Sequence, residues 1–341
     1  MSQTKNSYLY ILQIFRAVCV LIVIIHHTIP ALKYFNSREL PGYEMIYEFT
    51  KYGVDFFLLI SGFIIYYTHY YSSSNRTVKQ YYLSRFLRIY IPFLPLSIGM
   101  LLMHFIFPQL SEGGRNISLI TSLTLLPHGS PALSVTWSLV YEVMFYFLFG
   151  LCILNRKAWH ALLIVWFGLI IIFNYIYPIN YGYAIFLNPY CFNFMIGYIL
   201  SLLVIGDKKM SKIACAVGIL GFLGLYLIHY FTKQNWFLHD RNLLITGFHF
   251  FLAYLCVVYY NKNYSHLKYL FFIGNISYSV YLIHNPLISL LVRVFPKEVS
   301  TNQIVLLILT IVTCSLASGY FYCQIFEKKV VNYLKARLQW H

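Results

Sequence analysis

Long apolar stretches dominate the sequence and limit what it can fold into. A helix that crosses about 30 Å of hydrocarbon needs about 20 residues. Ten stretches come close to that length, namely 8–30, 54–71, 88–107, 133–154, 158–177, 185–205, 213–231, 243–260, 269–291 and 303–325. The chain of 341 residues is 60% hydrophobic and only 10% charged, with a mean hydropathy of +0.66, which excludes a water-soluble domain. We predict an all-α, polytopic membrane protein with about ten transmembrane helices.

The short segments between these stretches predict the orientation of the chain. If the N-terminus is cytoplasmic, the inner segments and the C-terminal tail carry about twice as many Lys and Arg residues as the outer loops. Both termini are therefore expected to be cytoplasmic. The formal charge of +15 follows from this topology, so we expect no nucleic-acid partner. We expect one integral-membrane domain over 1–341, with no appended soluble domain, and the sequence leaves its oligomeric state open.

Two smaller features complete the outline of the chain. The seven cysteines lie inside or at the ends of the apolar stretches, with no short pairing or metal-type spacing. We therefore expect inert core thiols and no bound metal. The segment 116–131 is apolar but too short to span, so it is expected at the outer surface or as a re-entrant piece.

The first apolar stretch contains an arginine, Arg16, and a histidine, His27, eleven positions further on. Burying an arginine in a bilayer costs about 2.5 to 3.5 kcal/mol even on the lenient insertion scale, so such a residue indicates a functional site. Eleven residues at about 100° each make three turns plus about 20°, so both side chains share one face about 16 Å apart. One helix therefore presents a cation and a titratable base to the same interior path.

The other unusual ionisable residues fall into two groups along the predicted membrane normal. His27 is expected at a depth similar to Asp55 and His284, near the outer ends of their stretches, and Glu142 lies about 13 Å deep from the outer side. Arg16, Arg85 and Arg88 lie toward the cytoplasm instead. This separation predicts a carboxylate and histidine cluster outside and a basic mouth inside.

Five local patterns occur in one order along the chain. They are the spacing of Arg16 and His27, GVDFFLLISGF at 53–63, SRFLRIYIP at 84–92, TWSLVYEVMFY at 136–146 and ISYSVYLIHNP at 276–286. Together they resemble acyltransferase family 3, whose members transfer acetyl or related acyl groups to sugar hydroxyls of cell-surface polysaccharides. The pattern at 137–146 is most similar to the exopolysaccharide-modifying branch. The resemblance extends from about residue 8 to about residue 325.

This resemblance implies an O-acetyltransferase of the bacterial inner membrane that modifies cell-envelope polysaccharide. Acyl-CoA, in the first place acetyl-CoA, would be the co-substrate and a glycan the acceptor, with no bound cofactor. Thioester-to-alcohol transfer needs a general base and oxyanion donors. An imidazole titrates near neutral pH, so we predict His27 as the base, with Asp55 or Glu142 as the carboxylate that orients it. Direct transfer and an acyl-enzyme on His27 or Ser61 stay open.

The remaining candidates are assigned to the two substrates. Guanidinium groups match phosphate oxygens, so Arg16, Arg85 and Arg88 are expected to bind the acyl-CoA donor. The residues expected on the acceptor or oxyanion side are Ser61, Trp137, Tyr146 and His284.

Most of these residues also have a structural alternative. Arg16 could form an ion pair or snorkel to the inner leaflet, and Arg85 and Arg88 could simply mark the cytoplasmic side. Asp55 could cap a helix and His284 could bond backbone near Pro286. His27 and its neighbour His26 could be satisfied core residues, and Trp137 could belong to the interfacial aromatic belt.

Two other classes of function compete with the acyltransferase. A transporter or flippase of a lipid-linked sugar could use the same buried charges as a proton or substrate path. A membrane scaffold would leave those charges without a role.

Overall fold

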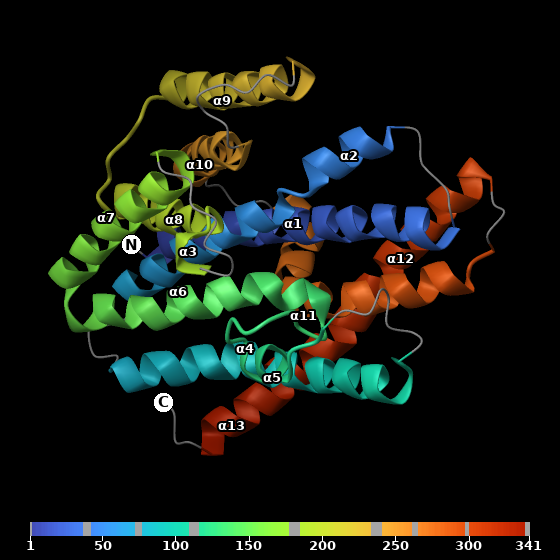
Figure 1. Cartoon of the computed structure of the whole chain (residues 1–341). Coiled ribbons are helices and arrows are strands. Elements are labelled where there is room, and N and C mark those ends of the chain that lie inside the picture. Colours follow the sequence, from blue (N-terminus) through green and yellow to red (C-terminus); the bar gives the residue numbers. More distant parts are fainter. Residues whose placement is uncertain are drawn as a thin grey trace. The chain divides into compact units, whose positions relative to one another are not determined.

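The chain is built from helices in every region that the computed structural model describes, residues 2–36, 42–71, 77–108, 116–176, 185–232, 241–260, 265–296 and 300–337 (Figure 1). The α-helices are α1 (Ser2–Asn36), α2 (Tyr43–Thr50), α3 (Gly53–Tyr71), α4 (Val78–Ile106), α5 (Leu119–Thr124), α6 (Trp137–Leu154), α7 (Arg156–Ile171), α8 (Tyr190–Ile205), α9 (Lys212–Thr232), α10 (Arg241–Tyr259), α11 (Lys268–Val294), α12 (Thr301–Tyr322) and α13 (Val331–Arg337). Short 3-10 turns are Ser134–Thr136, Ile185–Leu187 and Ser265–Leu267, and π-helical turns are Ile172–Ile176 and Cys323–Val330. These regions contain no strand, only an isolated bridge between Ile117 and Ser130.

Each predicted apolar stretch coincides with a helix. In the described residues, 7 helical segments are long and apolar enough to cross a membrane: Tyr10–Phe35, Tyr43–Tyr71, Val78–Ile106, Ser134–Leu154, Arg156–Asn174, Lys212–Thr232 and Asn302–Arg337. Two apolar helices, Tyr190–Ile205 and Leu243–Tyr259, are shorter. Helix α11 has 27 residues, with Lys268 and Arg293 near its ends. The all-α, polytopic prediction is confirmed, while the count of about ten crossings and the cytoplasmic termini stay predictions.

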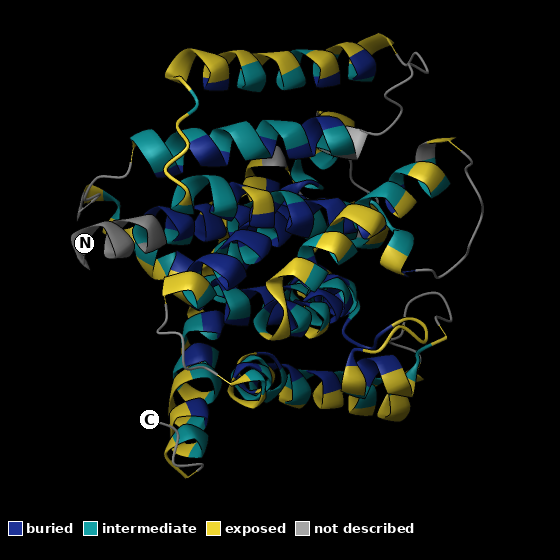
Figure 2. Ribbon diagram, turned by 90° about the vertical axis from the view of Figure 1, so that its left-hand side faces the viewer, coloured by how far each residue is buried: buried dark blue, intermediate teal, exposed yellow. Residues whose placement is uncertain are grey.

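The helix surfaces agree with a lipid environment. Large apolar side chains that protein does not cover include Ile213, Val217 and Leu220 on α9 and Ile164 on α7. Figure 2 shows that individual helices carry buried residues on one side and exposed residues on another. An exposed face that is apolar along a whole helix is typical of contact with acyl chains.

The helices cluster into two compact units. Unit 1 comprises 1–16, 52–78 and 148–271, and unit 2 comprises 17–51, 79–147 and 272–341. Helix α1 is continuous through the boundary at residues 16 and 17, so Arg16 belongs to unit 1 and His27 to unit 2.

Close contact between α3 and α8 organises unit 1. A Cβ atom at Gly62 would lie 2.2 Å from the carbonyl oxygen of Phe194, and one at Gly197 would lie 2.0 Å from that of Leu59. Only glycine allows two helix backbones to approach this far, which is the small-residue packing typical of membrane helices.

Tyrosine hydroxyls join the helices of unit 2. The hydroxyl of Tyr81 on α4 donates to the carbonyl of Tyr146 on α6 at 2.9 Å, and that of Tyr278 on α11 donates to the carbonyl of Ile89 on α4 at 2.9 Å. The hydroxyl of Tyr322 on α12 donates to the carbonyl of Pro92 at 2.6 Å. A hydroxyl in a membrane needs such a partner, so these bonds fix which faces of the helices meet.

The segment 116–131 contains the short helix α5, capped by Ser118, whose hydroxyl accepts from the backbone N–H of Thr121 at 3.1 Å. Two bonds attach it to α4: the hydroxyl of Tyr90 donates to the Thr124 carbonyl at 2.6 Å and that of Ser97 donates to the Ser122 carbonyl at 2.5 Å. The segment is therefore an ordered part of unit 2, and its depth in the membrane stays a prediction.

Candidate functional site

Two of the predicted site residues, His27 and His284, meet in unit 2. Their ring centroids lie 5.2 Å apart with an interplanar angle of 47°. His27 lies in the second half of α1 and His284 in the second half of α11, 257 positions further along the chain. Two helices distant in sequence therefore bring two titratable rings into contact inside an apolar bundle.

Hydrogen bonding sets the proton position on His284. Its Nδ1 atom lies 2.6 Å from the backbone carbonyl oxygen of Tyr281, one turn earlier on α11. A carbonyl can only accept, so Nδ1 carries the proton and Nε2 of the neutral ring carries a lone pair. The side chain is 0% exposed, and Nε2 has no hydrogen-bond partner among the described residues.

A cavity of about 560 Å³ in unit 2 has His27 in its wall. Its lining comes from 27–35 on α1, 100–104 on α4, 132–134 before α6 and 285–293 on α11. The volume is in the range of small-molecule sites, about 300 to 1,000 Å³. The lining carries His27, His104 and Arg293, and no Asp or Glu residue from the part of the chain that the structure describes.

A polar wall closes one side of this cavity. The Asn285 amide donates to the hydroxyl of Ser134 at 2.7 Å, and both residues line the cavity. Behind them, the hydroxyl of Tyr281 donates to the carbonyl of Val135 at 2.5 Å and lies 2.8 Å from the hydroxyl of Ser138. These bonds attach α11 to the start of α6, so the histidine on α11 is held in a fixed place beside the cavity.

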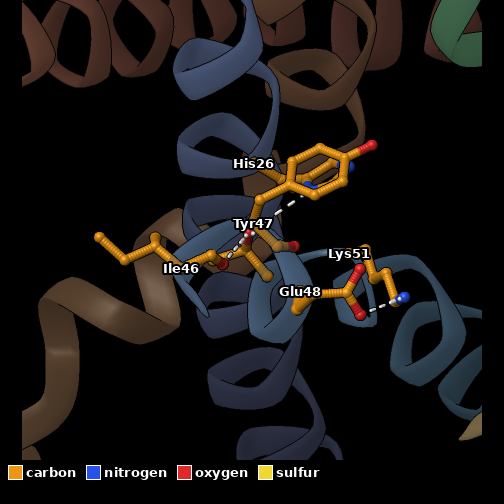
Figure 3. Close-up of polar contacts among 6 residues, drawn as sticks. His26, Ile46, Tyr47, Glu48 and Lys51 are labelled. Atoms are coloured by element: carbon orange, nitrogen blue, oxygen red, sulfur yellow. Dashed lines mark hydrogen bonds and ion pairs between the residues drawn. The ribbon is translucent and has the colours of Figure 1, made fainter. Parts of the chain in front are cut away.

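Beside His27, the predicted core residue His26 anchors the short helix α2. Its Nδ1 atom lies 3.2 Å from the hydroxyl of Thr50, and its ring stacks on Tyr47 with centroids 4.6 Å apart. Figure 3 shows His26 against α2, with the ion pair of Glu48 and Lys51 further along that helix at 2.6 Å. The rings of His26 and His27 also meet edge-on, with centroids 5.2 Å apart. His26 nevertheless has partners of its own on α2, which agrees with a structural role.

A basic cluster forms elsewhere in unit 2, around Tyr146. The guanidinium carbon of Arg85 lies 5.0 Å from the ring centroid of Tyr146 and 5.7 Å from that of Tyr81. The hydroxyl of Tyr146 donates to a carboxylate oxygen of Glu142, one turn earlier on α6. Arg88 also acts electrostatically on this hydroxyl. The structure thus brings Arg85, Arg88, Glu142 and Tyr146 together.

The two arginines of this cluster have no ion pair with a carboxylate in the described part of the chain. The Nε atom of Arg85 is buried and has no hydrogen-bond partner there. A guanidinium between two aromatic rings is oriented by them, while its N–H groups keep the geometry that binds phosphate oxygens.

Unit 1 holds Asp55 in a chain of buried polar groups. Asp55 lies in the first turn of α3 and accepts from the amide of Asn193 on α8 at 2.9 Å, and the hydroxyl of Thr246 on α10 donates to Asn193 at 2.7 Å. The three residues are 2%, 1% and 4% exposed, respectively. The contact of Asp55 with Asn193 was not predicted.

The remaining predicted residues have the following places. Arg16 in unit 1 is buried, donates to the side chain of Gln13 at 3.1 Å and lies 5.8 Å from the ring of Phe57. Ser61 is half-buried on α3. In unit 2, Trp137 begins α6 and packs edge-on against Tyr141.

Several residues of these sites were not predicted, and they share one signal in the sequence. Asn193, Thr246, Ser134 and Asn285 are uncharged polar side chains inside or beside apolar helices. Such residues need partners in a membrane, so they mark helix contacts even without a charge.

Comparison with known proteins identifies a family for the chain. A family model described as an acyltransferase domain of acyltransferase family 3 matches residues 9–322. No curated protein and no solved structure matches the chain.

Proposed function

The chain belongs to acyltransferase family 3, and from this premise we propose that it transfers an acyl group, in the first place acetyl, from acyl-CoA to a hydroxyl of a cell-surface or lipid-linked glycan. The family supports membrane acyltransferase activity in general. One observation carries the finer proposal: His27 contacts His284 and lines a cavity large enough for a small-molecule substrate.

In the proposed reaction, His27 takes the proton of the acceptor hydroxyl as its oxygen attacks the thioester carbon. The C–S bond then breaks, and the proton passes from His27 to the departing sulfur, so the products are an ester and free CoA. General-base catalysis of this kind contributes about 10²- to 10⁴-fold in rate. An N–H group of Asn285 or the hydroxyl of Ser134, both in the cavity wall, could stabilise the oxyanion, since preorganised donors are a common source of such stabilisation.

The cavity suits the acceptor because of the helix ends that line it. It is lined by the C-terminal halves of α1, α4 and α11, which all run outward in the proposed orientation, and by residues just before α6, which runs inward. These ends meet on the outer side of the bacterial inner membrane, where an exopolysaccharide or its lipid-linked precursor would enter. The polar wall and the aromatic ring of Phe35 suit hydroxyl groups and the apolar face of a sugar.

The basic cluster around Tyr146 suits the donor. Arg85 and Arg88 lie in the first half of α4, which is the cytoplasmic half in the proposed orientation. Their guanidinium groups would bind the phosphates of acyl-CoA, and Arg16, about 16 Å from His27 along one helix, would hold the pantetheine arm. Glu142 belongs to this cluster by its contact with Tyr146. The role of Asp55 as the carboxylate of the base stays a prediction from the sequence.

Release of CoA tests the proposal. Purified protein in detergent is given acetyl-CoA with and without membrane glycan extract, and free CoA is followed for wild type, His27→Gln and His26→Gln. We expect acceptor-dependent release from wild type and a loss of about 10²- to 10⁴-fold in His27→Gln. His26→Gln is the matched control, because the glutamine side chain can still donate to Thr50. Its rate of CoA release should stay within about threefold of wild type. This corresponds to less than about 1 kcal/mol, the scale of a surface substitution.

Two results would overturn this assignment. Full turnover by His27→Gln would remove the general base. No release by a monodisperse wild type with acetyl-CoA or other short acyl-CoAs would favour the transporter or flippase.

A further inference from the structure

We propose that His284 is the positioning residue for the base: its Nε2 atom accepts a hydrogen bond from a ring N–H of His27 and fixes how that ring faces the acceptor. This inference rests on the proposed function, in which His27 is the base. Neither the family match nor the sequence patterns assign this role to His284.

A backbone carbonyl sets the tautomer of His284. The Tyr281 carbonyl lies 2.6 Å from Nδ1 of His284 and can only accept, which places the proton on Nδ1. The neutral ring then has one acceptor site, the lone pair of Nε2. A backbone carbonyl on the same helix therefore prepares His284 to receive a hydrogen bond at a defined atom.

The surroundings of Nε2 in the described part of the chain leave this atom without a hydrogen bond. Leaving a buried polar atom without a hydrogen bond costs about 1 to 3 kcal/mol. Nε2 of His284 is such an atom among the described residues, on a side chain that is 0% exposed. The polar side chain in ring contact with it across the helix interface is His27, at 5.2 Å between centroids. In sites without substrate such bonds are often long, and they tighten when the reactants are bound.

The hydrogen bond between the two histidines would strengthen during the reaction. When one ring nitrogen of His27 takes the hydroxyl proton, the ring becomes an imidazolium with a proton on each nitrogen. The N–H that faces His284 then donates to Nε2, a charge-assisted bond that is stronger than the one in the resting state. When His27 returns its proton to the departing sulfur, the bond weakens again. No proton needs to move onto His284, so its own tautomer is unchanged through the cycle.

A purely structural role is the competing explanation. Pro286 cannot donate to the helix ladder, so a histidine near it could simply bond the local backbone. That role uses Nδ1 only and requires nothing of Nε2. The two explanations therefore differ in what the second nitrogen does.

Substitution separates them. His284→Gln keeps an acceptor oxygen close to the Nε2 position, whereas His284→Leu fills the space without one. We expect His284→Leu to lose kcat by about 10²-fold, the lower end of acid–base effects, with the KM values for acetyl-CoA and glycan within about threefold. His284→Gln should recover kcat to within about tenfold of wild type, since it restores the hydrogen bond.

The matched control is His249→Leu in unit 1, which removes another buried histidine whose Nδ1 has no hydrogen-bond partner in the described part of the chain. It should cost stability to a similar extent and leave kcat within about threefold, because packing losses act on folding. Equal kcat in His284→Leu and wild type would overturn the proposal. Equal losses of kcat in His284→Leu and His284→Gln, with both proteins folded, would overturn it as well.

A spectroscopic test works without turnover. Solid-state NMR of protein labelled with ¹⁵N-histidine, in liposomes and without substrate, reports which ring nitrogen carries a proton. The signal that disappears in His284→Leu should show a protonated Nδ1 and an unprotonated Nε2. A proton on Nε2 would overturn the proposal, because that atom could then not accept. Since this reading needs no acyl transfer, it is independent of whether the proposed function holds.

Discussion

Alanine at Gly197 tests the close approach of α3 and α8 in unit 1. The new Cβ would lie 2.0 Å from the carbonyl oxygen of Leu59 and 2.8 Å from the backbone nitrogen of Phe63. Real Cβ contacts stay above 3.0 Å, so the two backbones must separate by at least 1.0 Å at this point. Backbone atoms cannot turn away as a side-chain end can, so the whole interface has to move.

The cost of this movement has two parts. Overpacking of a well-packed interface costs about 1 to 3 kcal/mol, which we adopt for Gly197→Ala. One turn earlier on α8, Asn193 donates to Asp55 across the same interface at 2.9 Å. A separation of 1.0 Å would take that distance past 3.5 Å, the limit of a hydrogen bond, so we expect activity to fall together with stability.

Thermal unfolding in detergent measures the cost of overpacking, and CoA release measures the effect of losing the bond between Asn193 and Asp55. At about 2 to 4 °C per kcal/mol, Gly197→Ala should lower Tm by about 2 to 12 °C. Gly224→Ala on α9 is the control, because a Cβ there meets nothing within 4 Å and alanine favours a helix over glycine by about 1 kcal/mol. If both variants unfold at the same temperature with equal activity, the close approach of α3 and α8 is wrong.

Further predictions concern the polar contacts. Arg85→Ala should raise the KM for acetyl-CoA about 10- to 100-fold, since a hydrogen bond to a charged group contributes about 1.5 to 3 kcal/mol. The control Lys79→Ala, at an exposed position on the same helix, should leave this KM unchanged. Equal KM values in the two variants would contradict donor binding by Arg85. Thr246→Val should lower the free energy of unfolding in detergent by about 0.6 to 1.7 kcal/mol, because the side-chain oxygen of Asn193 loses its donor. Thr246→Ser keeps the hydroxyl and should not lower it. Tyr146→Phe should raise the KM for acetyl-CoA by less than Arg85→Ala does. A larger rise than that of Arg85→Ala would contradict the assignment of donor binding to the arginines of the basic cluster.

The positions of the helices could be predicted from the sequence because apolar length is a local property. Every predicted stretch coincides with a helix, including α1 with Arg16 and His27. The short helix α2 (Tyr43–Thr50) was missed, because eight residues between two spans give no length signal. Its position depends on a tertiary contact, the stacking of Tyr47 on His26.

The residues that meet in these sites could be predicted from the sequence in part, but most of their contacts could not. The predicted topology puts His27 and His284 at a similar depth, and the structure brings their rings together. Depth does not say which way a helix faces, so the contact of Glu142 with Tyr146, within the basic cluster, could not be predicted. Asn193 carries no charge, and its role beside Asp55 appears only when α3 and α8 are packed. The functional roles of all these residues stay predictions.

The central claim is best tested by following the acyl group itself. Wild type and His27→Gln, reconstituted in liposomes with lipid-linked glycan, are given radiolabelled acetyl-CoA, and the label on the glycan is measured before and after mild alkali. The account predicts label on the glycan of wild type, released by alkali as an ester should be, and none with His27→Gln. Unlabelled glycan that nevertheless crosses the membrane in the presence of wild type would contradict the account and identify a transporter.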